Sequence, residues 1–358
     1  MFNQRFPTIY AEGTPYKLGY IHGSEAKKQI LVSIATYKAM FEDYSNIAWD
    51  DAITAAKKYV AIITDYDEAL LEEMHGVADG ADVNFEDILA LNARSEIVLT
   101  GKYLEGCTSL AFKPEMTDVG DTIIGQNWDW KSTQKDAFIM LKLKQKNKPN
   151  VIMLTEAGII GKIGFNSAGL GLCINALASN KNPVGLPFHL ALRGILNSRT
   201  ICDAIRFIGN VGVACPAHFL IGHKNGEVVT IESVPEDFDV IYGSNNYITH
   251  TNHFISSRFT TIKDTGKLIF PDTFVRLGRA NRLIGNLNRR VTYDDIKTIF
   301  SDHIEYPNSI CRHEDENVSM GMRMSTVFSI IMNLGKMEME FCLGQPCVNK
   351  YTLLHGQL

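Results

Sequence analysis

The sequence predicts an α+β protein in which antiparallel sheets are covered by layers of helices. Three observations lead to this fold class. The first hundred residues read mainly as helix, the pattern changes near Gly101 to short β-rich runs, and helices and strands then follow one another in blocks. Regular strand–helix–strand alternation, which would predict a parallel sheet, is not visible. We expect one intertwined domain, although a chain of 358 residues could also form two.

The expected helices of the first hundred residues have apolar positions that recur at threes and fours. This pattern runs through residues 19–44 and again from residue 51 to about 78. Asn84, followed by Asp87 and an apolar run, is typical of a helix N-cap with an acidic first turn. Strands begin close to Cys107, so we place the boundary between the two parts of the chain there.

The part after this boundary alternates blocks of strands and helices. The first strands are expected at CTSLAF, TIIGQNW, AFIMLKL, VIMLTEAG and FNSAGLGLCINAL, and two helices follow at 187–196 and 201–208. Strands return at HFLIG, EVVTIES, DFDVIYG and NYITHTN, before helices at 273–287 and 293–300. The final pair, STVFSIIMNL and MEMEFCLG, has the alternation of a half-buried antiparallel hairpin.

Charge and targeting signals restrict the partners and the compartment. The formal net charge is only −5 and no basic tract is visible, so nucleic acid and anionic membranes are not expected partners. The start of the chain lacks the basic-then-apolar pattern of a secretory signal, and no apolar run approaches the roughly 18 residues that span a bilayer. The ending HGQL is not a peroxisomal or endoplasmic-reticulum address. We therefore expect a cytoplasmic protein.

The seven cysteines give no sequence pattern of a metal or redox site. There is no CxxC, and the nearest pair, Cys342 and Cys347, has no matching histidine cluster. Two histidines that flank Asn252, His250 and His253, lack a further ligand at useful spacing and read as structural. We expect no metal ion and mostly buried free thiols.

One cysteine lies at the predicted boundary, in the run Glu105-Gly106-Cys107-Thr108-Ser109. Taken alone, a glycine before a cysteine at the start of a strand is more typical of a turn followed by a buried thiol. The surrounding motifs change this interpretation. They are GTPYKLGYIHGSEAK, LNARSE, EGCTSLAF, GQNWDW, TEAGIIGKIGFNSAG, HLALR, HTNHF and YPNSICR.

With these motifs, in this order and at similar spacing, the chain resembles the acyl-coenzyme A:6-aminopenicillanic acid acyltransferase family along nearly its whole length. This is the isopenicillin N acyltransferase-like family, peptidase family C45 of the N-terminal-nucleophile (Ntn) hydrolases. The resemblance implies two antiparallel sheets between helical layers, an αββα sandwich. It also implies a zymogen that cleaves itself into an α subunit, residues 1–106, and a β subunit, residues 107–358, which stay together as a heterodimer.

The chemistry of this cut can be followed in the residue types. Gly106 has no Cβ, so the Cys107 thiol could approach its carbonyl closely. Attack would convert the amide to a thioester, and water would then release a Cys107 that carries both a thiol and an α-amine. The unperturbed pKa of an α-amine is about 7.7–8, against about 8.5 for a thiol, so the amine can accept the thiol's proton.

The resemblance also implies roles for residues outside the cleavage site. Asn252 matches the family's catalytic asparagine, whose amide can stabilise an oxyanion, and Asp129 in GQNWDW matches the active-site aspartate. Arg323 in GMRMS best matches the active-site arginine, which would pair with Asp129 or with an anionic substrate group, and Arg312 in SICR is its rival. Ser233 matches a serine associated with processing and activity.

Thr108 and Ser109, next to the cut, could position its carbonyl or supply backbone donors. The expected function is hydrolysis or acyl transfer at a small linear amide through an acyl-Cys107 thioester. No cofactor is expected, and water, an amine or coenzyme A could be the acceptor. The alternatives are a non-catalytic binding protein on an Ntn fold and a bile-salt or penicillin V-type hydrolase. The run GMRMS lacks the serine of the penicillin enzymes, and the C-terminus lacks the peroxisomal tripeptide, so penicillin biosynthesis itself is not expected.

Overall fold

The computed structural model describes residues 6–98, 106–181, 183–243, 245–320 and 323–356. Its first part forms one strand and a series of helices: β1 (Thr8–Gly13), α1 (Pro15–Glu25), α2 (Lys27–Ser45), α3 (Trp49–Lys57), α4 (Val60–Asp67), α5 (Ala69–Ala81), α6 (Phe85–Asn92) and α7 (Arg94–Val98). The predicted helix at 19–44 is thus two helices, and the predicted segment from 51 to about 78 is three. The N-cap at Asn84 is confirmed, because Asn84 and Asp87 form a reciprocal capping box at the start of α6.

Glycines allow α1 and α5 to pack with their backbones almost in contact. A Cβ atom added at Gly19 would lie 1.8 Å from the carbonyl oxygen of Glu73, and one at Gly76 would lie 2.1 Å from that of Tyr16. Because no side chain fits at these positions, the glycines of the GYIHG run have a packing role.

An eight-stranded sheet joins the N-terminal segment to the rest of the chain. Its order is β1, β4 (Phe138–Gln145), β5 (Val151–Glu156), β6 (Ile163–Asn166), β7 (Leu170–Ala176), β8 (Ala217–His223), β9 (Val228–Val234) and β10 (Asp237–Ile241). All neighbours are antiparallel except the edge strand β1, which runs parallel to β4. The sequence patterns did not predict β1, and its pairing departs from the expected all-antiparallel sheet.

The second sheet has six strands and carries the predicted cleavage site. Its order is β11 (Tyr247–His250), β2 (Gly106–Phe112), β3 (Ile123–Trp130), β12 (Ser325–Asn333), β13 (Glu338–Leu343) and β14 (Thr352–His355), and every pair is antiparallel. The predicted terminal hairpin is β12 and β13. It differs from the expectation in one respect: β12 is buried at all of its positions, because it lies between β3 and β13 and both of its faces are covered.

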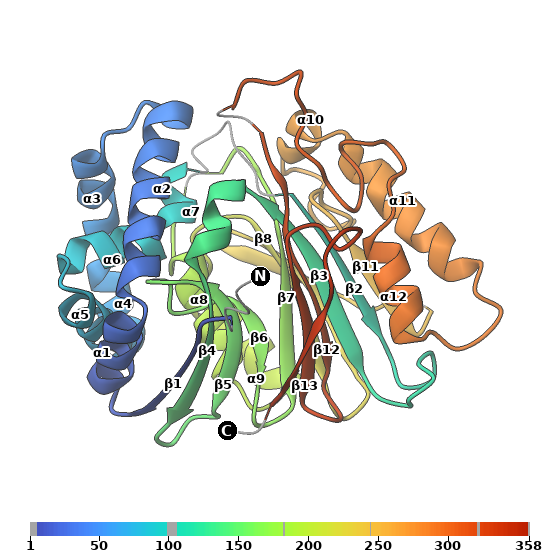
Figure 1. Ribbon diagram of the computed structural model, residues 1–358, viewed down its shortest axis with the longest axis horizontal. Coiled ribbons are helices and arrows are strands. Elements are labelled where there is room, and N and C mark those ends of the chain that lie inside the picture. The colour runs from blue at the N-terminus through green and yellow to red at the C-terminus, as the bar shows by residue number, and fades with distance from the viewer. Residues whose placement is uncertain (1–5, 99–105, 182, 244, 321–322, 357–358) are drawn as a thin grey trace.

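Helices enclose the two sheets on both sides. The remaining helical elements are η1 (Ser132–Ala137), α8 (Phe188–Leu196), α9 (Ile201–Val211), α10 (Gly266–Ile269), α11 (Asp272–Gly285) and α12 (Tyr293–Phe300). In Figure 1 the helices α1 to α6 lie on one side of the paired sheets and α10 to α12 on the other. The predicted αββα sandwich is therefore confirmed. Among the described helices, none has the length and apolar character needed to cross a bilayer.

The alternation of side chains along β2 decides what each of its residues faces. The Thr108 hydroxyl contacts α11, and Leu110 belongs to a buried cluster with residues of α11 and α12. Cys107 and Ser109 point the other way, toward β7 of the eight-stranded sheet. The Cys107 side chain thus enters the main core between the sheets, while Gly106 faces the layer that contains α11.

Candidate active site around the Gly106–Cys107 bond

Both backbone polar groups of Cys107 are held by side chains from distant parts of the chain. Its N–H donates to Asn252 Oδ1 at 2.9 Å, and its carbonyl oxygen accepts from Arg276 Nη1 at 2.6 Å. Cys107 itself is fully buried in β2. The peptide unit on each side of the Cys107 Cα therefore has a fixed orientation at the predicted cleavage site.

Gly106 lies directly opposite Asp129 across β2 and β3. A Cβ atom added at Gly106 would lie 2.7 Å from Asp129 Oδ2, 2.9 Å from Asp129 Cβ and 3.3 Å from Arg312 Nε. Cβ atoms essentially never approach other heavy atoms more closely than about 3.0 Å. The structure thus requires glycine at this position for a reason that the sequence alone did not reveal, the close approach of a carboxylate–guanidinium pair.

A chain of alternating charges connects this pair to Cys107. Arg312 Nε lies 3.3 Å from Asp129 Oδ2, and another guanidinium nitrogen of Arg312 bonds Asp272. Asp272 in turn accepts from Arg276 Nε at 2.7 Å. The order Asp129–Arg312–Asp272–Arg276 places each charge beside one of opposite sign, which is how buried charges are tolerated in proteins.

Hydroxyl groups and backbone contacts fix the ends of this chain. The Thr326 hydroxyl donates to Asp129 Oδ1 at 2.7 Å and accepts from the Arg312 backbone N–H at 2.9 Å. Arg276 also donates to the Thr108 hydroxyl at 3.1 Å and to Asn252 Oδ1 at 3.0 Å. Asp272, Arg276 and Thr326 were not among the predicted site residues. Asp272 and Arg276 had one sequence signal, their i,i+4 spacing at the start of α11, but such a pair more often lies on a helix surface.

At both Asp129 and Asp272, burial raises the pKa and the neighbouring guanidinium groups lower it, but the balance differs. Burial raises the pKa of Asp129 above its ordinary value, although Arg312 and Arg276 act to lower it. Burial also acts to raise the pKa of Asp272, but the guanidinium groups of Arg276 and Arg312 outweigh it, and the pKa lies below the ordinary value. Of these two carboxylates, Asp272 is the one more firmly held in its charged form.

Asn252 lies at the predicted site, but its side chain has a different orientation from the expected one. Its amide oxygen faces Cys107, while its Nδ2 donates to the carbonyl oxygen of Ala176 at 3.0 Å. Its own backbone N–H donates to the Thr273 hydroxyl at 2.8 Å. In this structure, the amide donor that we expected to stabilise an oxyanion is thus bonded to β7.

The remaining predicted residues fall into two groups. Thr108 and Ser109 flank the site: Thr108 contacts Arg276, and the Ser109 hydroxyl donates to Asn175 Oδ1 at 2.6 Å. Ser233 lies in β9 of the other sheet, opposite Ala217 and Phe238, and none of the described hydrogen bonds joins it to Cys107.

The arginine that contacts Asp129 is Arg312, so the expectation that Arg323 makes this pair is corrected. Arg323 lies outside this pair. Its guanidinium donates to the carbonyl oxygens of Val318 and Glu316 at 3.2 and 3.1 Å. Counting back from the STVFSII strand favoured Arg323 over its rival Arg312, whereas the tertiary fold brings Arg312 to Asp129. The Arg312 backbone carbonyl accepts from Thr326 N at 3.0 Å.

The two histidines beside Asn252 have structural partners, as expected. His250 Nε2 lies 2.9 Å from Glu232 Oε1, and its ring stacks on His218. His253 Nδ1 lies 2.9 Å from the Thr273 hydroxyl. These contacts hold the segment that presents Asn252.

A cavity of about 560 Å³ opens beside the charged chain. It lies between α10, the start of α11, residues 305–318 and Met324, and Asp272 and Arg312 form part of its wall. Apolar side chains, including Phe270, Val275 and Met324, line the remainder. Its volume lies in the range of small-molecule sites, and a few polar groups in an apolar wall are typical of them.

Comparison with known sequences identifies the family of this chain. The family described as acyl-coenzyme A:6-aminopenicillanic acid acyl-transferase matches residues 116–347, more than half of the chain. The acyl-coenzyme A:6-aminopenicillanic-acid-acyltransferase 40 kDa form of Emericella nidulans is 31% identical over 342 residues, which cover 94% of this chain and 92% of the relative. The chain belongs to this acyltransferase family. An enzyme of the amidase and acyltransferase class was expected, and family membership confirms it at that level.

Solved structures give weaker likenesses than the acyltransferase family does. A mutant conjugated bile acid hydrolase from Clostridium perfringens is 13% identical, with a TM-score of 0.48, and covers 70% of this chain and 92% of its own. Penicillin V acylase from Agrobacterium tumefaciens is 11% identical, with a TM-score of 0.45, and covers 70% and 86%.

Proposed function

We propose that this chain is the precursor of an Ntn amidohydrolase or acyltransferase that cleaves its own Gly106–Cys107 bond. The observation that carries the proposal is the arrangement of that bond. Cys107 is held through its N–H by Asn252 and through its carbonyl by Arg276, and Gly106 is pressed against Asp129 where no side chain fits. A core strand does not need two side chains from outside the sheet to fix one residue, so this arrangement favours chemistry at Cys107.

The proposed cut is an exchange of acyl bonds at Gly106. The Cys107 sulfur attacks the Gly106 carbonyl carbon, the C–N bond breaks, and the nitrogen takes up a proton as the α-amine forms. Water then hydrolyses the Gly106 thioester and leaves a carboxylate on residue 106. The contact between Cys107 N and Asn252 Oδ1 supports this step, because the same oxygen can hold the new amine after the cut.

In the mature enzyme, the α-amine of Cys107 acts as the base for its own thiol. An amine and a thiol with ordinary pKa values about one unit apart exchange a proton readily near neutral pH. The thiolate attacks the carbonyl of a small linear amide, expels the amine and forms an acyl-Cys107 thioester. Water, an amine or coenzyme A then accepts the acyl group, and this chemistry needs no bound cofactor.

We assign the substrate to the cavity beside Arg312 and Asp272. This cavity lies on the Gly106 face of β2, whereas the Cys107 side chain points toward β7, so the assignment requires the Cys107 N-terminus released by the cut to turn toward the cavity. Its apolar wall suits an acyl chain, and the two charged groups suit the polar end of an amide or amino acid conjugate. Arg312 connects the cavity to the cleavage site, because its Nε lies 3.3 Å from Asp129 Oδ2 opposite Gly106.

The mass of the freshly purified protein tests the proposal. Two fragments that meet between Gly106 and Cys107 are expected, and Cys107→Ala should give only the full-length mass. Cys202→Ala is the matched control, since Cys202 is an exposed free thiol on α9 and its loss should leave the cut unchanged. A screen of N-acyl amines, penicillin V, glycocholate and acyl-coenzyme A would follow.

One result would favour, in place of this proposal, a binding protein without catalytic activity. In that case the wild-type chain stays at full length after prolonged incubation, and iodoacetamide leaves Cys107 unmodified.

A further inference from the structure

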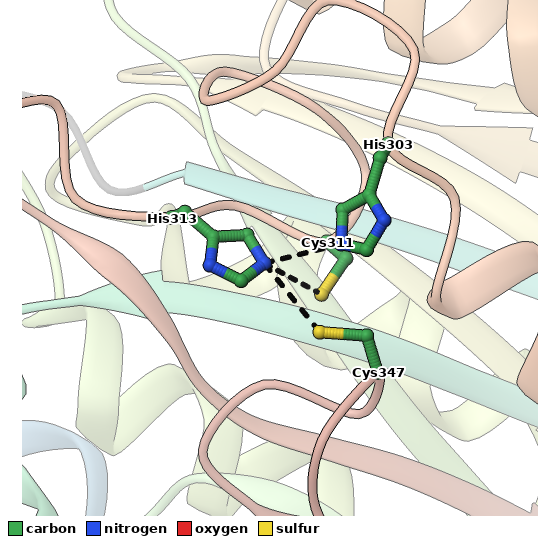
Figure 2. Close-up of side chains that lie close together, drawn as sticks. All are labelled: His303, Cys311, His313 and Cys347. Carbon is green, nitrogen blue, oxygen red and sulfur yellow. Dashed lines mark hydrogen bonds between the residues drawn. The ribbon is translucent and has the colours of Figure 1, made fainter.

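Four side chains of the types that bind metal ions, from two separate segments, lie close together (Figure 2), and one of them, His313, lines the cavity. His303, Cys311 and His313 belong to the segment between α12 and β12, and Cys347 follows β13. Their ligand atoms all lie within 4.8 Å of one another. The pairing of Cys347 with histidines was invisible in the sequence, because His313 lies 34 residues before it.

Three of the six distances between the ligand atoms, those from His313 Nε2, match the edges of a zinc tetrahedron, and the other three lie within 4.8 Å. His313 Nε2 lies 3.1 Å from His303 Nε2, 3.5 Å from Cys347 Sγ and 3.8 Å from Cys311 Sγ. Ligand bonds of about 2.0–2.1 Å to nitrogen and about 2.3 Å to sulfur give edges of about 3.3 Å between two nitrogens and about 3.6 Å between nitrogen and sulfur. All three observed separations therefore lie within a few tenths of an ångström of the expected values.

Protein hydrogen bonds alone do not explain this convergence. An imidazole Nε2 carries either one hydrogen or one lone pair, so His313 Nε2 can satisfy one of its three neighbours. Figure 2 shows that the three contacts radiate from the same nitrogen. A cation among the four ligand atoms would satisfy all of them at once.

We propose that His303, Cys311, His313 and Cys347 bind one zinc ion. Two thiolates and two neutral imidazoles balance the ion's charge and complete four-fold coordination. Since no position remains for water or substrate, the site is structural. This inference is independent of the proposed cleavage at Cys107.

The zinc site would also position a residue of the candidate active site. Arg312 lies between the ligands Cys311 and His313, and it pairs with Asp129 and Asp272. His313 and Arg312 both line the cavity. An ion that ties this segment to Cys347 would therefore hold one wall of the cavity and the guanidinium beside Gly106.

Cobalt binding to the full chain provides the test. The purified protein is treated with a chelator, and Co²⁺ is then titrated with the visible spectrum as the readout. We expect one ion per chain, with the ligand-field bands of tetrahedral cobalt and thiolate-to-cobalt charge transfer, and displacement by one equivalent of Zn²⁺. Zinc should also be present at one equivalent in protein purified without chelator.

Two ligand variants and one control make the assignment specific. His303 is exposed, so His303→Ala removes a ligand without disturbing the core, and Cys347→Ser removes a half-buried thiolate. Each should weaken cobalt affinity by more than about tenfold, whereas Cys202→Ser should not change it. The proposal is overturned if wild-type protein shows no thiolate-to-cobalt band, if Cys347→Ser binds like wild type, or if Cys311 and Cys347 form a disulfide in the isolated protein.

Discussion

Gly106 is packed against the Asp129 carboxylate more tightly than any side chain would allow. The same carboxylate is held by Thr326 and Arg312, so it cannot move aside without losing both contacts. Glycine is therefore required at the predicted cut by its close neighbours, in addition to the conformational freedom that it provides.

Replacement of Gly106 by alanine should block self-cleavage. The added Cβ would lie 2.7 Å from Asp129 Oδ2 and would displace either the carboxylate or strand β2. We expect the rate of cleavage to fall by about 100-fold or more, since small displacements at a reacting centre have effects of this size. Gly278→Ala in α11 is the matched control, because no atom lies within 4 Å of its added Cβ. Unchanged cleavage in Gly106→Ala would contradict the proposed role of this contact.

The two candidate arginines can be separated by conservative substitution. Arg312→Lys keeps the charge but loses the planar fork that contacts both Asp129 and Asp272, so cleavage or turnover should fall by about 100-fold. Arg323→Lys should stay close to wild type, because its guanidinium contacts only backbone carbonyls among the described bonds. The measurement is the rate of fragment formation for each variant, and the opposite ranking would restore Arg323 to the site.

Glu96 should make the stability of the protein depend on pH. Burial raises its pKa from 4.5 to about 7, while a backbone hydrogen bond from Phe188 acts to lower it. The folded state thus binds the proton more tightly than the unfolded state, and stability falls as pH rises from about 4.5 to about 7.

Glu96→Gln keeps an oxygen for the Phe188 N–H and removes the titration. At pH 8 the variant should be more stable than wild type by up to about 3 kcal/mol, and at pH 4 the two should agree. Urea unfolding at both pH values measures the difference. The exposed Glu72→Gln is the control for the substitution itself. An equal effect of Glu96→Gln at both pH values would argue against this assignment.

At the scale of elements, a buried ion pair joins helix α5 to helix α8. Both terminal guanidinium nitrogens of Arg193 bond Glu73, at 2.9 and 2.8 Å, and both side chains are almost fully buried. Arg193 also donates to the carbonyl of Ile160 and to Gln145. This pair connects the segment before the proposed cut with the segment after it.

Loss of one partner of this ion pair should destabilise the fold strongly. Glu73→Ala leaves a buried guanidinium without its carboxylate, which typically costs about 3–5 kcal/mol of unfolding free energy. The exposed pair of Asp237 and Arg258 supplies the control, and Asp237→Ala should cost less than about 1 kcal/mol. Urea unfolding of both variants makes the comparison, and equal costs would show that burial does not strengthen the effect.

Several helices and strands could be predicted because their own residues carry the signal for them. The capping box at Asn84, helix α12 and the strands around Cys107 were predictable because their residues carry periodicity or turn chemistry. Edge strand β1 was not, since six residues can pair with β4 only once the distant sheet exists. The residues of the candidate site likewise fall into a part that sequence motifs suggest and a part that only the tertiary structure brings together. Family motifs pointed to Cys107, Asp129 and Asn252 as candidates, whereas Arg276 and the proposed zinc ligands are brought together only by tertiary folding.

At the scale of the whole molecule, the eight-stranded sheet takes its strands from both sides of the proposed cut. Residues 8–13 form the outer strand of the eight-stranded sheet, and every residue of β1 has a partner in β4. Helices α1 to α6 cover the same half of the molecule (Figure 1). The two fragments should therefore remain associated after cleavage.

The parallel edge strand also fixes the order in which a mature enzyme can be made. A polypeptide that starts at Cys107 would leave β4 with a free row of N–H and C=O groups, which invites pairing with other copies and aggregation. Synthesis as one chain supplies β1 in equal amount and at high local concentration while the sheet closes. If the chain is cut as proposed, assembly of the sheet precedes the cut, and the full-length protein already holds both parts of the two-chain product in place.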